Sequence, residues 1–191
     1  MTERQPNSKA TAILNTARDL MMESGYNGFS FRDIAEIVGI KSASIHYHFA
    51  TKPDLAEAVA KEYRQNFREL TAQIEATSAS DLMREYGGLF VSTLQNQRGL
   101  CLCGVLAADV SSLPERVRSE VALFFADQYD WVTNVLRNGQ ATGEIRNDLD
   151  AGMFAKLFVS SLEGAMLVAR GIEKPQDLEA SLDALIQLSK A

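Results

Sequence analysis

The sequence predicts an all-α fold of about nine helices. Apolar residues recur at the three- and four-residue spacing of a helix through most of the chain. Glycine and proline are few (12 and 4), several glycines such as Gly25, Gly39 and Gly99 lie between the periodic segments, and no segment of strand length alternates with period two. The chain of 191 residues is 46% hydrophobic and 23% charged, which is typical of a globular protein and excludes a wholly disordered one.

Two longer helices frame the N-terminal third. The first runs from about residue 8 to residue 24, and Gly25 is placed to end it. The second starts at Thr51, a side chain suited to capping, tolerates Pro53 in its first turn and extends to about residue 77. Each has one apolar face, formed by Ile13, Leu14, Ala17, Leu20 and Met21 in the first and by Leu55, Val59, Tyr63, Phe67, Leu70 and Ile74 in the second.

Two short helices lie between these longer ones. Ser30 with Asp33 three residues later resembles a capping box, which opens a helix over residues 32–38. Gly39 then breaks the chain before a second short helix over residues 42–49. Two short helices joined by a glycine-containing turn and braced by a longer helix are the layout of a helix-turn-helix.

The rest of the chain continues as helices. Periodic segments predict helices over 82–94, 114–136, 154–168 and 174–189, and a short apolar segment with both cysteines follows Gly99. The helix over 154–168 is apolar on both sides, and in a protein of this size the second side usually meets a partner subunit.

Charge is distributed unevenly along the chain. The net charge is −6, yet residues 1–68 hold 9 basic and 8 acidic residues while residues 69–191 hold 10 and 17. The first third is therefore near neutral and the remainder is acidic, which indicates two parts with different partners.

The sequence favours a cytoplasmic protein. Residues 1–9 are polar and carry no signal-peptide pattern. The most apolar stretch, 153–169, is interrupted by Lys156 and Glu163, so no membrane-spanning segment is expected. Two cysteines cannot form a disulfide framework.

The second short helix has the side chains of a DNA-reading element. Small residues at 42–44 allow close approach to the major groove, and His46, Tyr47 and His48 supply hydrogen-bonding groups. Lys52 adds an ammonium at the start of the next helix, which is a favourable phosphate site.

The segment over residues 31–55 resembles the DNA-binding signature of the tetracycline-repressor (TetR) family of bacterial transcriptional regulators. The shared positions are Asp33-Ile34-Ala35, Gly39, His48-Phe49, Lys52 and Leu55. Lys41, Ala43 and His46 depart from the residues usual in that family, which obscures the operator sequence.

The resemblance implies a helix-turn-helix domain over residues 1–50 and a helical effector-binding and dimerisation domain over 51–191, connected by the helix 51–77. It implies a homodimeric repressor that leaves a palindromic operator on a small-molecule or redox signal. The expected DNA contacts are Ser30, Arg32, Lys41, Ser42, Ala43, Ser44, His46, Tyr47, His48 and Lys52. The expected dimer interface is Phe154, Phe158, Leu162, Met166, Leu182 and Leu185. The expected effector pocket or sensor is Tyr86, Phe90, Cys101, Cys103, Phe125, Gln128, Trp131 and Glu163.

Cys101 and Cys103 leave three alternatives open. They are small buried apolar residues, or thiols that sense oxidants or electrophiles with Arg98 supplying positive charge, or part of an incomplete metal shell. We predict no metal site and no cofactor.

Two other functions compete with the regulator. A thiol-based enzyme would use Cys101 and Cys103, and a helical dimerisation module would bind no DNA. No common catalytic motif is found, and both histidines lie in the predicted reading helix. We therefore expect no enzymatic activity, and a module that only dimerises would have no need for that helix.

Overall fold

The computed structural model describes residues 8–95 and 99–191, and within them the all-α prediction is confirmed. These residues form nine α-helices, one 3-10 turn and no strand beyond an isolated bridge between Ile145 and Lys190. The helices are α1 (Ser8–Ser24), α2 (Phe31–Val38), α3 (Ser42–His48), α4 (Lys52–Ala72), α5 (Ala79–Gln95), α6 (Leu102–Ala108), η1 (Val110–Ser112), α7 (Glu115–Thr142), α8 (Ala151–Gly171) and α9 (Gln176–Ser189). They pack as two compact units.

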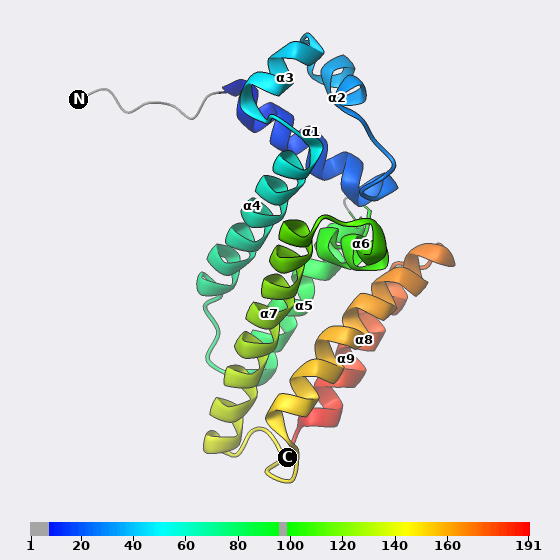
Figure 1. Cartoon of the computed structure of the whole chain (residues 1–191). Coiled ribbons are helices and arrows are strands. Elements are labelled where there is room, and N and C mark those ends of the chain that lie inside the picture. The colour runs from blue at the N-terminus through cyan, green and yellow to red at the C-terminus, as the bar shows by residue number, and fades with distance from the viewer. Residues whose placement is uncertain (1–7, 96–98) are drawn as a thin grey trace, which may run out of the picture. The chain divides into compact units, whose positions relative to one another are not determined.

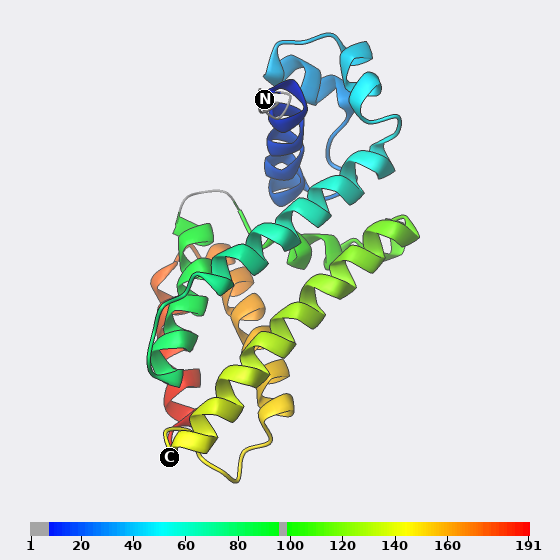
Figure 2. The same cartoon turned by 90° about the vertical axis from the view of Figure 1, so that its left-hand side faces the viewer.

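The first unit contains the chain up to Asn66 together with Leu102–Ala122. Helices α1, α2 and α3 form one group in both views (Figures 1 and 2). The core around them consists of fully buried apolar side chains, among them Ile13, Ala17, Met21, Ile34, Ile45 and, from α4, Leu55. This small core fixes the angle at which α3 follows α2.

The connection from α2 to α3 has the local chemistry that the sequence predicts. Ser30 caps α2, and its hydroxyl and backbone N–H donate to Asp33 Oδ2 at 2.8 and 2.7 Å. Gly39 ends α2 with φ of 72°, in the left-handed region that glycine adopts without steric cost. A single glycine therefore turns the chain from α2 toward α3.

The first unit also contains α6 and the start of α7, and α6 packs against α1. The Asp109 carboxylate accepts the backbone N–H of Tyr26 at 2.9 Å. Arg116 on α7 pairs with Asp54 on α4 at 2.6 Å. These contacts join segments that are distant in sequence, so the helix-turn-helix packs in one unit with part of the chain that the sequence assigns to the C-terminal domain. The predicted boundary at residue 50 remains a prediction.

The second unit contains Phe67–Cys101 and Leu123–Ala191. Helices α8 and α9 lie side by side, and both pack against α5 (Figure 1). Gly87 on α5 permits a close approach to α9, because a Cβ atom there would overlap the Leu182 side chain. The interior of this unit is formed largely by aromatic and aliphatic side chains.

The residues predicted for the dimer interface lie instead in the core of this unit. All six are buried inside the single chain: Phe154, Phe158, Leu162, Met166, Leu182 and Leu185. The large apolar side chains that α8 and α9 leave exposed are Met153, Leu157, Leu167, Val168 and Leu188. Both sides of α8 are apolar. The sequence pattern therefore does not show which side packs in the core and which side stays exposed.

Helix α8 is long and apolar enough, by length and composition, to cross a membrane. The core helix of a soluble protein meets the same test. One side of α8 forms the interior of the second unit, and the helix carries Lys156, Glu163 and Arg170. The composition of α8 is thus explained by one buried and one exposed apolar side.

Candidate nucleic-acid interface and effector site

Helix α3 presents almost all of its side chains to solvent. Ile45 is its one buried residue and anchors it in the core of the first unit. Tyr47 is 85% exposed, which is unusual for a large aromatic side chain, and its ring meets the His48 ring edge-on at 5.2 Å. Most other predicted DNA contacts are likewise exposed, namely Ser30, Arg32, Lys41, Ser42, Ala43 and His46, while Ser44, His48 and Lys52 are half-buried. The predicted residues therefore gather around one exposed helix.

His46 is oriented by two contacts. Its Nδ1 lies 3.1 Å from the Ala50 carbonyl oxygen, and its ring meets the ring of Phe31 edge-on at 4.8 Å. Because a carbonyl oxygen accepts only, this contact is a hydrogen bond when Nδ1 carries a proton. The two contacts hold the imidazole ring between the start of α2 and the end of α3.

Lys52 is engaged inside the first unit. Its ammonium donates to the Phe29 carbonyl and lies 4.1 and 5.0 Å from the ring centroids of Phe29 and Tyr26. Burial lowers the pKa of Lys52, and the nearby Asp33 carboxylate partly opposes this. The ammonium has three N–H donors, so the phosphate contact predicted for this residue would use a donor other than the one that binds the Phe29 carbonyl.

A second candidate site lies in the interior of the second unit, around the buried ring of Tyr86. Trp131 stacks on this ring with centroids 5.2 Å apart and an interplanar angle of 15°. The rings of Phe90, Phe158 and Phe67 surround it at 5.5, 6.0 and 5.8 Å. Four helices, α4, α5, α7 and α8, thus bring aromatic side chains to one point.

Polar groups lie within this aromatic surround. The Tyr86 hydroxyl donates to Gln128 Oε1, and the Cys101 thiol hydrogen-bonds to the Glu163 carboxyl group. The second polar atom of each acceptor residue, Gln128 Nε2 and Glu163 Oε1, is buried without a hydrogen-bond partner. We name Tyr86, Cys101, Gln128 and Glu163 the buried polar cluster.

Burial dominates the electrostatics of the buried polar cluster. It raises the pKa of Glu163 from 4.5 to about 7, and the hydrogen bond from Cys101 offsets this only in part. Burial also raises the pKa of Tyr86 well above its ordinary value, and the Glu163 charge adds to that increase. Glu163 therefore changes its charge near neutral pH, whereas Tyr86 keeps its proton.

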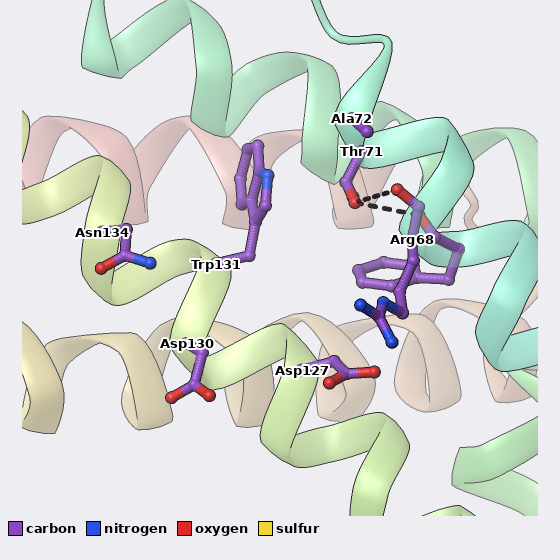
Figure 3. Close-up of a pocket in the computed structure, with 8 residues that line it drawn as sticks. Arg68, Thr71, Ala72, Asp127, Asp130, Trp131 and Asn134 are labelled. Atoms are coloured by element: carbon purple, nitrogen blue, oxygen red, sulfur yellow. Dashed lines mark hydrogen bonds between the residues drawn. The ribbon is translucent and has the colours of Figure 1, made fainter.

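A groove of about 260 Å³ lies between α4 and α7 in the same unit (Figure 3). Phe67 and Trp131 supply its apolar lining, and Asp127 and Asp130 lie along α7. The guanidinium of Arg68 points toward Asp127 in Figure 3. Because Trp131 also stacks on Tyr86, one aromatic side chain takes part in both the groove and the surround of the buried polar cluster.

The structure brings together most residues of the predicted effector pocket. Tyr86, Phe90, Cys101, Gln128, Trp131 and Glu163 lie around one point in the second unit. Cys103 belongs to the first unit, and the Phe125 ring meets the ring of Phe124 edge-on at 5.6 Å. Sequence reasoning missed Phe67 and placed Phe158 at the dimer interface; both lie on apolar helix faces whose direction the sequence does not give.

The two thiols lie in different units, Cys101 in the second and Cys103 in the first, and both are buried. Reactive cysteines usually lie in partly exposed, electropositive settings, so their burial favours the packing interpretation. Arg98, the predicted source of charge, lies outside the described residues. Within residues 8–95 and 99–191 no group of three or more His, Cys, Asp or Glu side chains could hold a metal ion.

Comparison with known proteins yields matches along most of the chain. Residues 13–59 match the family model "Bacterial regulatory proteins, tetR family", and residues 89–185 match "Tetracyclin repressor-like, C-terminal domain". A crystal structure of a TetR-family transcriptional regulator from Agrobacterium tumefaciens is 35% identical, with a TM-score of 0.90 over 98% of this chain and all of that one.

Two curated relatives carry the names of regulators. The transcriptional repressor DhaR of Mycobacterium sp. is 27% identical and covers 81% of this chain and 79% of its own length. The transcriptional regulator UidR of Escherichia coli is 26% identical and covers 98% of this chain and 97% of its own length.

Proposed function

Because this chain belongs to the TetR family of bacterial transcriptional regulators, we propose that it is a homodimeric repressor that binds a palindromic operator and leaves it when a small effector binds. DNA binding by a helix-turn-helix is common to the family and to the named regulators among its relatives. Dimerisation, repression and the effector are the parts proposed for this chain. It acts in the cytoplasm, on nucleoid DNA.

The observation that carries the proposal is the exposure of α3. Ile45 holds this helix in the core while Tyr47 and the small residues before it stay in solvent. A recognition helix needs this combination, since its backbone must come close to the base edges in the major groove. Arg32 and Lys41 add exposed cations beside it for phosphate contacts.

The exposed apolar side of α8, with Leu188 of α9, is the proposed dimer surface. A contiguous exposed apolar face on two neighbouring helices is typical of an interface between subunits. Helix-turn-helix dimers read two half-sites about one turn of DNA, about 34 Å, apart. The operator is therefore expected to be palindromic.

The contacts of α6 suggest how an effector could act on the DNA-reading helices. The Cys101 thiol hydrogen-bonds to Glu163, and Cys101 directly precedes α6. Helix α6 in turn packs against α1. A ligand that displaces Cys101 therefore pulls on a helix that belongs to the same unit as α1–α3. The effector then shifts the population between a DNA-binding and a released state.

We expect Leu157→Glu to convert the dimer to a monomer. Leu157 is 52% exposed in the single chain, so the substitution leaves the monomer folded but buries a charge in the dimer. Light scattering coupled to gel filtration should give twice 21.0 kDa for the wild type and 21.0 kDa for the variant. Leu123→Glu, at an apolar α7 position that is 43% exposed, is the matched control and should remain dimeric. A Leu157→Glu protein that stays dimeric and binds operator DNA like the wild type would refute the proposed surface.

A further inference from the structure

The two unpartnered atoms of the buried polar cluster call for an explanation. Gln128 is fully buried on α7, and its Nε2 has no acceptor. On α8, Glu163 Oε1 has no donor. Buried polar groups in native proteins almost always have a partner, so an atom of a bound molecule is the expected completion of such a site.

The neighbours of these two atoms define what each can accept or donate. The Tyr86 hydroxyl occupies Gln128 Oε1, which leaves the Nε2 of the same amide as a hydrogen-bond donor. The Cys101 thiol bonds one Glu163 oxygen, so Oε1 remains as an acceptor when the carboxyl group is ionised. Tyr86 links the two residues, because its hydroxyl bonds Gln128 and its ring lies 6.0 Å from that of Phe158 on α8, the helix that carries Glu163. The Glu163 charge also acts on the Tyr86 phenol, so we treat both atoms as one site.

The surroundings restrict the rest of the ligand. Flat rings of Tyr86, Trp131 and Phe158 favour a planar apolar body. The Glu163 carboxylate repels an anion, and the Gln128 Nε2 donor needs an acceptor atom, which an ammonium or guanidinium group does not have. An uncharged molecule that presents an acceptor beside a donor satisfies both atoms at once.

We propose that Gln128 and Glu163 are the point at which the second unit recognises its effector, and that this effector is an uncharged carboxamide-like compound on an aromatic or similarly planar body. Its carbonyl oxygen accepts from Gln128 Nε2, and its N–H donates to Glu163 Oε1. This inference rests on the proposed function, since it names the effector class of the same regulator. Trp131 is the side chain whose movement would connect the groove between α4 and α7 with the site.

Benzamide and benzoate are suitable probes because they differ at the recognised group and share a ring. Trp131 is the single tryptophan of the chain and stacks on Tyr86, so its fluorescence reports directly on the site. At pH 8, where Glu163 with its pKa of about 7 is ionised, we expect the dimer to bind benzamide roughly tenfold or more tighter than benzoate. In Glu163→Gln the new amide can donate to a carboxylate, so the preference should disappear or reverse.

Glu85→Gln is the control, because it makes the same charge change at an exposed position of α5 and should keep the wild-type preference. Absence of any benzamide-dependent change in the wild type would overturn the inference and leave internal waters as the partners of both atoms. Equal affinity for both probes, or an unchanged preference in Glu163→Gln, would overturn it as well. Operator binding is measured on the same samples by fluorescence anisotropy. Intact DNA binding without probe selectivity refutes the effector class alone, whereas a protein that binds no DNA sequence refutes the proposed function.

Discussion

Replacing Glu163 by Gln should make the folding stability of the protein depend less on rising pH. Burial holds the pKa of Glu163 at about 7 in the folded state, whereas the ordinary value of 4.5 applies to the unfolded chain. Between these two pH values the unfolded state has lost the proton while the folded state retains it, so the stability of the wild type falls as pH rises. The two pKa values of Glu163 differ by about 2.5, which corresponds to about 3 kcal/mol of unfolding free energy. This stability is lost completely by about pH 8. Below about pH 4.5 Glu163 is protonated in both the folded and the unfolded state, so its titration no longer changes the stability.

The assay is urea unfolding at pH 5, 6, 7 and 8 at one protein concentration, because the stability of the proposed dimer would depend on concentration. Glu163→Gln should match the wild type within about 1 kcal/mol at pH 5 and exceed it by up to about 3 kcal/mol at pH 8. The difference between the two proteins isolates Glu163 from every other titrating group. A difference that stays constant across this pH range would refute the buried, ionisable state of Glu163, and Glu85→Gln should show no such trend.

Two further substitutions test the first unit. Ser30→Ala removes the cap of α2 and its bonds to Asp33 and should cost about 1 kcal/mol, seen as a lower melting temperature; an unchanged melting temperature would contradict the capping box. Lys52→Ala removes the bond to the Phe29 carbonyl and the contacts with two rings, and we expect a loss of about 1–2 kcal/mol in urea unfolding. Unchanged stability with weaker DNA binding would instead assign Lys52 to phosphate contact.

The helix-turn-helix could be predicted from sequence because its determinants are local. Ser30 and Asp33 lie three residues apart, and Gly39 needs only its own backbone conformation to make the turn. The reading helix follows directly, and the exposure of Tyr47 agrees with the role expected for it.

The assignment of helix faces could not be predicted in the same way. Phe158 and Leu157 are neighbours on a helix that is apolar all round, and only packing against α5 and α9 determines that Phe158 is buried while Leu157 is exposed. The pairing of Cys101 with Glu163 depends on residues 62 positions apart. Such contacts between distant segments leave no local pattern in a single sequence.

Helix α3 is the element proposed to read a DNA sequence. Selection of bound fragments from genomic DNA, carried out in parallel with the wild type and Tyr47→Ala, tests it most directly. Tyr47 is 85% exposed, so its loss should change stability by no more than about 0.5 kcal/mol and leave the dimer intact. We expect the wild type to enrich one palindromic sequence, in a salt-sensitive manner, and the variant to enrich none. Failure of the wild type to enrich any sequence, or equal enrichment by Tyr47→Ala, would contradict the assignment of α3 as the reading helix.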